Sequence, residues 1–190
     1  MAITNTTKMR VLIAEDDCDI AASYKLALEE RGHKVTLTNN GEDCLIKYNE
    51  ELQSVRERAN SPESDSIYRF HPFHAVILDY KMPKIDGMEV AKEILAINSH
   101  QRIIFASAYV KETLEDAVRQ LNHTTELMQK PFGEQQLIDV IEDKQIYDEL
   151  KKLNVDADAF MTVSPPHELI TDLLQRIKEL QKGRHPKEKM

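Results

Sequence analysis

Residues 75–87 read AVILDYKMPKIDG, and this stretch decides the fold that we expect. Ala75 to Leu78 is a short apolar run, which is typical of a strand buried on both faces of a sheet. The run ends at Asp79, and the Pro, Asp and Gly residues within 82–87 are typical of a loop. The stretch therefore predicts a buried strand whose carboxyl end carries an aspartate.

The same pattern recurs on either side of this stretch. Residues 9–14 (MRVLIA) are apolar and end abruptly at three acids, Glu15, Asp16 and Asp17. Strands are expected at residues 9–14, 33–38, 75–78, 102–106 and 126–129, and helices at residues 19–31, from 41 past 55, 88–97, 111–121 and from 133 onward. Because strands and helices alternate through five rounds, we expect a doubly wound α/β fold with a five-stranded parallel sheet covered on both faces.

Two segments do not fit this alternation. Residues 50–73 combine an extended helix with the polar stretch RERANSPESDS and are interpreted as a surface insertion. Residues 154–190 follow the expected domain, 1–153, and hold one extra C-terminal helix at 166–181 and a basic tail at 182–189. This extension is too short for a helix-turn-helix domain with its supporting helices, and no catalytic domain fits into it.

The composition narrows the class of protein. The 190 residues carry a net charge of −8, which argues against broad attraction to nucleic acid, so direct DNA binding is not expected. No apolar run approaches the ~20 residues that span a bilayer, and the polar N-terminus does not resemble a secretory signal. Cys18 and Cys44 have neither metal-ligand spacing nor a secreted context. A cytoplasmic protein without membrane contact is therefore expected.

The chemically informative residues follow the expected strands. Glu15 and Asp16 follow the first strand, Asp79 the third, Ser107 the fourth and Lys130 the fifth. Carboxylates gathered at one sheet edge repel each other unless a cation or a lysine neutralises them. Oxygen ligands of this kind suit Mg²⁺, which also accepts a phosphate oxygen as ligand. A lysine and a hydroxyl at the same place can bind a phosphoryl group, and an aspartate can accept it as an acyl phosphate.

Four segments together, VLIAEDD, VILDYKMPKIDG, IIFASA and QKPF, resemble the receiver domain of two-component response regulators. The resemblance covers about Lys8 to Leu153, with the four motifs in the family's order and spacing. It implies a flavodoxin-like fold in which Asp79 is phosphorylated by a histidine kinase or a phosphotransfer protein. A single-domain receiver of this kind would signal through contacts with an unknown downstream protein.

The resemblance also implies a role for each residue of the site. Glu15 and Asp16 match the acidic pair that holds Mg²⁺ together with Asp79, and Asp16 is the expected direct ligand. Lys81 would offer its backbone carbonyl to the metal. Ser107 matches the hydroxyl residue that moves toward the phosphoryl group. Lys130 matches the lysine that pairs with that group, and the peptide bond between Lys130 and the following proline is expected to be cis. Asp17 and Asp86 are expected to have local roles, at a helix N-terminus and in a loop.

The sequence departs from the family pattern at the residues that change conformation on phosphorylation. The residue three positions before the lysine is often aromatic in the family, whereas here it is Leu127. Tyr109, two residues after Ser107, is the nearest substitute, and a partly buried loop aromatic without a switching role is an equal alternative. The residues 121–124 replace a small Gly-Ala turn. The insertion at 50–73 is expected to affect the choice of partner rather than the chemistry.

Two other functions are alternatives to a working phosphoacceptor. One is a receiver-like scaffold that no longer turns over phosphate, which the complete set of acids, hydroxyl and lysine argues against. The other is an aspartyl-phosphate phosphatase, which needs a second acid two residues after the nucleophile. That position is Lys81 here.

The C-terminal helix has an apolar seam. Ile170, Leu173, Ile177 and Leu180 follow the a/d spacing of a coiled coil. Two heptads are too few for an isolated coiled coil, so the helix must pack on its own domain, on a partner or on a second copy. The apolar positions 146, 150 and 153 extend the preceding helix beyond the usual receiver boundary. We therefore favour a homodimer through the C-terminal helices.

Overall fold

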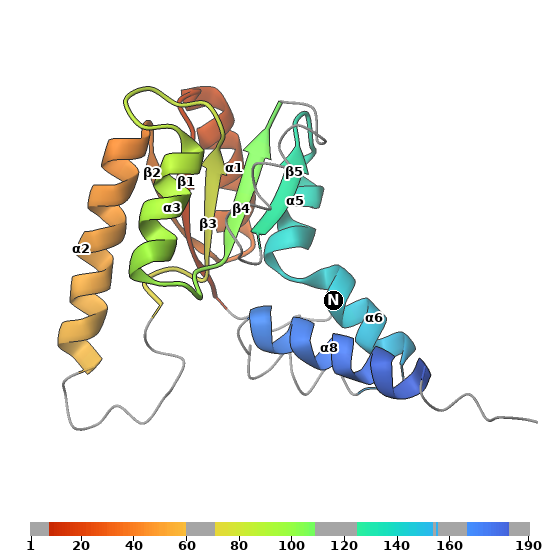
Figure 1. Cartoon of the computed structure of the whole chain (residues 1–190). Helices are drawn as coiled ribbons and strands as arrows, with labels where there is room; N and C mark the ends of the chain where they lie inside the picture. The colour runs from red at the N-terminus through yellow and green to blue at the C-terminus, as the bar shows by residue number, and fades with distance from the viewer. Residues whose placement is uncertain (1–7, 60–70, 109–124, 154, 156–166, 183–190) are drawn as a thin grey trace, which may run out of the picture. The chain divides into compact units, whose positions relative to one another are not determined.

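The computed structural model describes residues 8–59, 71–108, 125–153, 155 and 167–182. The chain divides into two compact units, one from Lys8 to Ile138 and the other beginning at Asp139. The described helices and strands are β1 (Arg10–Ala14), α1 (Cys18–Glu30), β2 (Lys34–Thr38), α2 (Gly41–Ala59), β3 (Ala75–Asp79), α3 (Gly87–Ile97), β4 (Ile103–Ser107), β5 (Thr125–Gln129), α5 (Glu134–Ile141), α6 (Lys144–Lys152) and α8 (His167–Lys182) (Figure 1).

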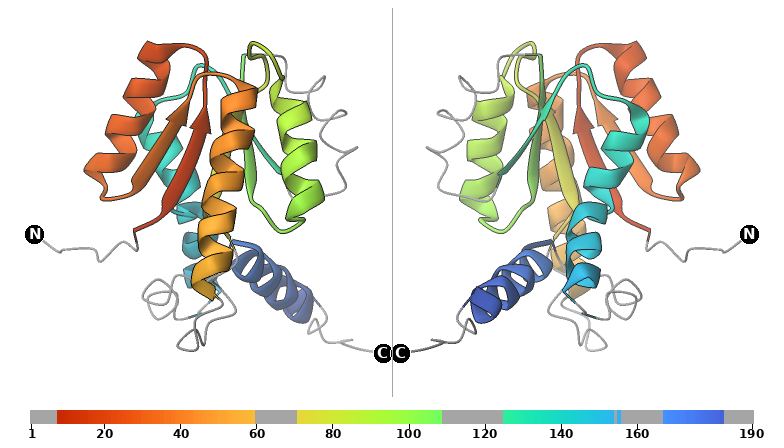
Figure 2. Two further views of the ribbon diagram at one scale, coloured as in Figure 1. Left: turned by 90° about the vertical axis from the view of Figure 1, so that its left-hand side faces the viewer. Right: turned by 90° about the vertical axis from the view of Figure 1, so that its right-hand side faces the viewer.

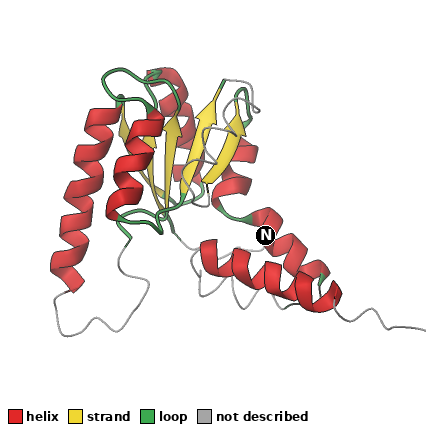
Figure 3. Cartoon of the chain, in the orientation of Figure 1, coloured by secondary structure: helices red, strands yellow, loops and turns green. Residues whose placement is uncertain are grey.

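The five strands form one parallel sheet in the order β2-β1-β3-β4-β5 (Figure 3). Helices α1 and α5 cover one face, and α2 and α3 cover the other (Figure 2). The expected doubly wound, flavodoxin-like fold is therefore confirmed. Because all strands run the same way, their carboxyl ends meet at one edge of the sheet. That edge is where Asp79 ends β3.

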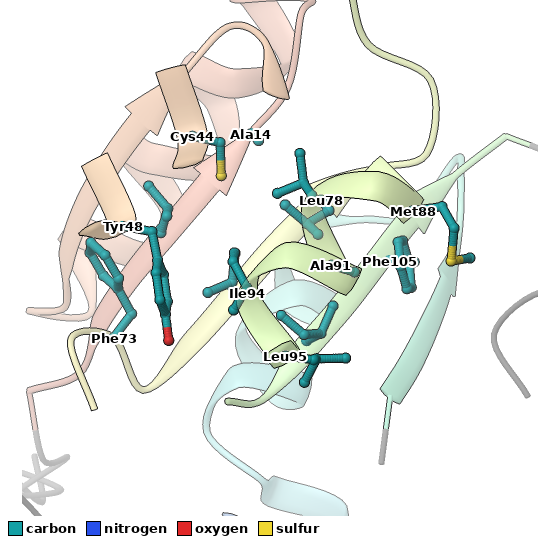
Figure 4. Close-up of a cluster of buried hydrophobic side chains, with 14 of the residues drawn as sticks. Ala14, Cys44, Tyr48, Phe73, Leu78, Met88, Ala91, Ile94, Leu95 and Phe105 are labelled. Carbon is teal, nitrogen blue, oxygen red and sulfur yellow. The ribbon is translucent and has the colours of Figure 1, made fainter. Parts of the chain in front are cut away.

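The apolar runs become strands because both of their faces are buried. On one face, the side chains of the strands pack against α2 and α3 in a single core (Figure 4). Tyr48 of α2 is fully buried in this core, and its hydroxyl donates to Gln101 Oε1 at 3.0 Å. The Asn98 amide donates to the same hydroxyl at 3.2 Å. The one polar atom of this buried ring is thus satisfied, as burial requires.

Two acids begin helices in the way that short polar side chains favour. The Asp17 side chain accepts hydrogen bonds from the backbone N–H groups of residues 19 and 20 at the start of α1. The Asp86 side chain accepts one from Glu89 N at 2.9 Å at the start of α3. Both are N-caps, which confirms the role expected for Asp17, whereas Asp86, expected to shape the loop, caps α3 instead.

The structure differs from the sequence expectation after residue 133. The expected single helix is two helices, α5 and α6, because Asp143 has a left-handed backbone with φ of 54°. Helix α2 reaches Ala59, which accounts for the helical start of the 50–73 segment. The rest of that segment up to residue 70 and the helix expected at 111–121 lie outside the described residues.

In the second unit, α6 and α8 pack against each other. Their shared core consists of the buried residues Tyr147, Leu150, Ile170 and Leu174. An ion pair between Lys178 and Glu149 and a 2.7 Å contact between His167 Nδ1 and Asp143 Oδ1 lie beside this core. Helix α8 therefore packs on the preceding helix of its own chain. None of the described helices is both long enough and apolar enough to cross a membrane.

Gly87 provides a test of how tightly the loop after β3 is built. A Cβ atom added at Gly87 would lie 2.1 Å from the carbonyl oxygen of Asp79, whereas one added at Gly133 would have no atom within 4 Å. We expect Gly87→Ala to lower the free energy of unfolding by about 1–3 kcal/mol, as overpacking does. Gly133→Ala should cost less than about 1 kcal/mol, from a poorer helix start alone. Equal effects in urea denaturation would contradict the close backbone approach.

Candidate functional site

The acidic site forms where β1 and β3 end. These strands are adjacent and parallel, with Ala14 paired to Leu78, so the residues that follow this pair lie next to each other. One carboxylate oxygen from each of Glu15, Asp16 and Asp79 lies within 4.8 Å of the other two. Glu15 is buried, Asp16 is exposed and Asp79 is half-buried. The expected acidic cluster is therefore present in the structure.

Lys130 reaches this cluster from the end of β5. Its Nζ donates to Asp79 Oδ2 at 2.8 Å and to Glu15 Oε2 at 2.5 Å. The lysine side chain is only 13% exposed, so the two ion pairs are shielded from solvent. The Lys130–Pro131 peptide bond is cis, as the resemblance implied. The lysine therefore neutralises part of the charge that three carboxylates bring together.

Ser107 and Lys81 lie near Asp79 along the backbone, since Ser107 follows Ala106, the residue paired with Asp79 across β3 and β4. Ser107 ends β4, the strand between β3 and β5, and is 1% exposed. Its carbonyl oxygen accepts a hydrogen bond from Lys130 N at 2.8 Å. The backbone N–H of Lys81 donates to Asp79 Oδ1 at 3.3 Å, so the loop after β3 folds back beside the carboxylate. Both residues are thus placed around Asp79.

The expected switch residues are only partly described. Leu127 lies in β5 and is partly buried against the core formed with α2 and α3. Tyr109 lies outside the described residues, so its substitute role stays a prediction.

Burial sets the electrostatics of the cluster. Burial raises the pKa of Glu15 to about 7, and the nearby charge of Asp79 adds to this, although Lys130 opposes it. Burial also works against the charged form of Lys130, but its hydrogen bonds and ion pairs to Asp79 and Glu15 outweigh that effect and raise its pKa. The site therefore holds an ammonium beside a carboxyl whose pKa is raised to near neutral.

The ligands in this cluster fit a hard divalent cation. The three side chains offer only oxygen, and exposed Asp16 leaves room for water on the metal. Mg²⁺ prefers such oxygen ligands, keeps several waters and takes one or two carboxylates. One ammonium against three carboxylates also leaves negative charge for a cation to neutralise. The residues present therefore suit Mg²⁺.

Sequence reasoning missed the contacts that hold the loop carrying Lys130. The ring of Phe132 stacks on Tyr24 of α1, with ring centroids 5.1 Å apart. On the same helix, the Ser23 hydroxyl donates to Glu134 Oε1 at 3.2 Å. These contacts join residues more than a hundred positions apart, so no local pattern in the sequence points to them. They attach the segment after Lys130 to α1.

Comparison with known sequences shows a family match over most of the unit from Lys8 to Ile138. The sequence model of the response regulator receiver domain matches residues 45–142. This range includes Asp79, Ser107 and Lys130, whereas Glu15 and Asp16 precede it. A similar protein is the response regulator receiver protein CpdR of Brucella abortus, 29% identical over 136 residues, or 70% of this chain and 93% of CpdR.

Other relatives are longer than the part that they share with this chain. The transcriptional regulatory protein PdtaR of Mycobacterium tuberculosis is 29% identical over 133 residues, or 70% of this chain and 55% of PdtaR. For PdtaR and several other curated relatives, the chain spans only about half of their length.

Solved structures share the fold at low identity. A CheY-like receiver domain protein from Methanospirillum hungatei has a TM-score of 0.56 at 21% identity, covering 77% of this chain and 98% of that one. CheY in a CheX-CheY-BeF3-Mg complex from Borrelia burgdorferi has a TM-score of 0.55 at 23% identity, covering 72% of this chain and 88% of that one.

Two adjacent aspartates provide a matched test of the metal site. Asp16 belongs to the carboxylate cluster, whereas the Asp17 side chain caps α1. Asp16→Asn should weaken Mg²⁺ binding at least about tenfold, because it removes a charged oxygen ligand. Asp17→Asn should leave the affinity unchanged, because asparagine caps helices equally well. Calorimetric titration measures both. The same affinity in Asp16→Asn and in the unmodified protein would show that the ligand set is wrong.

The raised pKa of Glu15 predicts a pH dependence of stability in metal-free protein. The carboxyl is protonated more readily in the folded chain, at about pH 7, than at its ordinary value of 4.5. Its contribution is therefore present below pH 4.5 and is lost as the pH rises through 7. In chelator, the free energy of unfolding of the unmodified protein should fall over this range relative to that of Glu15→Gln. Parallel curves in urea denaturation would contradict the raised pKa.

Proposed function

The chain belongs to the response regulator receiver domain family, and from this membership we propose that Asp79 is its phosphoacceptor. The observation that carries the proposal is the position of Asp79 at the end of the central strand, with Lys130 Nζ at 2.8 Å and two further carboxylates beside it. CheY-like folds and receiver proteins are parts of two-component signalling, so the donor is a histidine kinase or a phosphotransfer protein.

In the proposed reaction, an Asp79 carboxylate oxygen attacks the phosphorus of a phosphohistidine on the donor. The P–N bond breaks as the new P–O bond forms, and the histidine nitrogen leaves with the electron pair. The Lys130 ammonium lies beside Asp79 and can neutralise a phosphoryl oxygen as charge builds up. Ser107 is proposed to donate its hydroxyl hydrogen to another phosphoryl oxygen.

The proposed metal ligands are Glu15, Asp16, Asp79 and the backbone carbonyl of Lys81. A bound Mg²⁺ would supply positive charge that neutralises the carboxylates and the incoming phosphoryl group. The magnesium-containing CheY complex and a Pseudomonas aeruginosa receiver domain with magnesium in its active-site cleft, whose fold matches with a TM-score of 0.50, support this assignment. The ion pairs of Lys130 with Asp79 and Glu15 hold the carboxylates close together until the metal binds.

We propose that the protein catalyses only its own phosphorylation and dephosphorylation. It would not act on a separate substrate, because the second acid of an aspartyl-phosphate phosphatase is replaced by Lys81. A scaffold that does not turn over phosphate would not need Lys130 to pair with both Asp79 and Glu15.

The partners follow from this role. The phosphorylated state would be read by a downstream protein, as the pairing of CheX with CheY illustrates for a relative in fold. Ser107, Leu127 and Tyr109 are the proposed switch residues. Direct DNA binding is not proposed, and a cytoplasmic location stays a prediction. A second copy of the chain, bound through the C-terminal helices, is the remaining proposed partner.

The domain arrangement is also a proposal. Residues 1–153 would form the receiver part, with an insertion within 50–73 that affects partner choice, and residues 154–190 the extension. Because α6 shares its core with α8, the last helix of the receiver part also contacts the extension.

Asp79 and Asp86 provide a matched test of the phosphoacceptor. Asp79→Asn should abolish labelling by a small phosphodonor with Mg²⁺, because it removes the nucleophile and keeps the shape. Asp86→Asn should label normally, since Asp86 caps α3 and asparagine preserves the cap. Intact-mass spectrometry after treatment measures both. Full labelling of Asp79→Asn would show that another residue accepts the phosphoryl group.

A further inference from the structure

We propose that α8 binds the α8 of a second copy of this chain in an antiparallel arrangement, through Leu169, Leu173 and Leu180. These three residues, called the outer stripe here, follow spacings of four and seven and so lie on one side of the helix. The proposal rests on the homodimer proposed above and names the surface that forms it. It does not depend on the chemistry of Asp79.

The structure buries most of the apolar seam of α8 against α6 and leaves its last residue exposed. Ile170 is 2% exposed and belongs to the core shared with α6, whereas Leu180 is 68% exposed. Leu174, which is outside the a/d spacing, is buried in that core instead. Within the outer stripe, Leu173 is partly buried at the edge of that core. Leu169 and Leu180 are exposed and remain for a further contact.

The core between the two helices is small. Among the described residues, it has four buried members, Tyr147, Leu150, Ile170 and Leu174, with partly buried apolar residues packed around them. Both cysteines of the chain lie outside it, at positions 18 and 44, so no disulfide can strengthen it. Small cores are commonly completed by association. The large exposed side chains of Leu169 (49%) and Leu180 (68%) provide a surface for that association.

The charges along α8 point to a second copy as the occupant. The first half of the helix, 167–174, contains two acids and no lysine or arginine, for a formal charge of −2 with histidine neutral. The second half, 175–182, contains three bases and one acid, for a formal charge of +2. Two such helices attract each other when they run antiparallel, because each negative half then lies along a positive half.

The outer stripe fits the same arrangement. Leu169 and Leu180 are equally distant from the helix midpoint, between residues 174 and 175. A two-fold axis there places Leu169 of one copy opposite Leu180 of the other, at both ends of the contact. It also brings Asp172 of one copy beside Arg176 of the other. Within one chain these two residues form an ion pair and are 54% and 72% exposed, so both can reach a partner.

The mass of the full chain in solution tests the proposal. Sedimentation velocity should give twice the chain mass of 21.9 kDa at the higher protein concentrations. Leu180→Lys should weaken the dimer at least about tenfold, because two lysines would replace the leucines at the ends of the contact. Leu26→Lys is the matched control, since Leu26 is 60% exposed on α1, and it should dimerise normally. Circular dichroism checks that both variants keep their helix content.

Two results would overturn the proposal. A monomer at every concentration would mean that the outer stripe faces another partner or the chain's own first unit. Equal dimerisation of Leu180→Lys and Leu26→Lys would mean that the copies meet through a different surface. Phosphodonor labelling of Asp79 in the same samples is expected to be normal in both variants, so a failed dimer and a failed phosphoacceptor are told apart.

A charge exchange tests the antiparallel arrangement. Asp172→Arg alone should weaken the dimer, because it places a positive charge beside Arg176 of the other copy. The double variant Asp172→Arg, Arg176→Asp should recover part of it, because the pairs within and between the chains are re-formed although the opposite net charges of the two helix halves are lost. A double variant no better than the single one would contradict this pairing.

Discussion

The ion pairs of Lys130 with Asp79 and Glu15 are the contacts on which the site depends. The parallel sheet places the ends of β1 and β3 side by side, which brings three carboxylates within 4.8 Å. Where they are partly buried, the carboxylates of such a cluster repel one another and destabilise the folded state. Lys130 offsets this repulsion from the end of β5, two strands away from β3. The remaining negative charge suits the cation that we propose for this site.

The position of Lys130 depends in turn on contacts between helix α1 and the segment that follows the lysine. Phe132 stacks on Tyr24, and Ser23 donates to Glu134, so α1 holds the segment that follows the lysine. Helix α1 also begins at Asp17, next to the acidic pair. One helix therefore places both the acids at the end of β1 and the base at the end of β5. This explains how the acids after β1 and the lysine after β5, which are distant in sequence, are held within a few ångströms of each other.

The features predictable from the sequence were those with a local cause. Apolar runs such as Ala75–Leu78 became strands because a parallel sheet buries both faces, and Asp17 and Asp86 became caps because short acids accept backbone hydrogen bonds. The convergence of Glu15, Asp79 and Lys130 was predictable because parallel strands end at one edge. The Tyr24–Phe132 stack was not, since it is a distant contact. Nor was the helix break at Asp143, where no glycine marks the left-handed residue. Which residues of the α8 seam are buried depends on how α6 packs against the helix, and heptad spacing alone does not predict that packing.

The chemical identity of the modified residue tests the central claim most directly. After treatment of the full chain with a phosphodonor and Mg²⁺, borohydride reduces an aspartyl phosphate to homoserine, and peptide sequencing by mass spectrometry locates it. We expect homoserine at position 79 alone, and none when Mg²⁺ is removed by a chelator. Homoserine at another acid, or phosphate retained on a hydroxyl residue, would contradict the assignment of Asp79 as the phosphoacceptor.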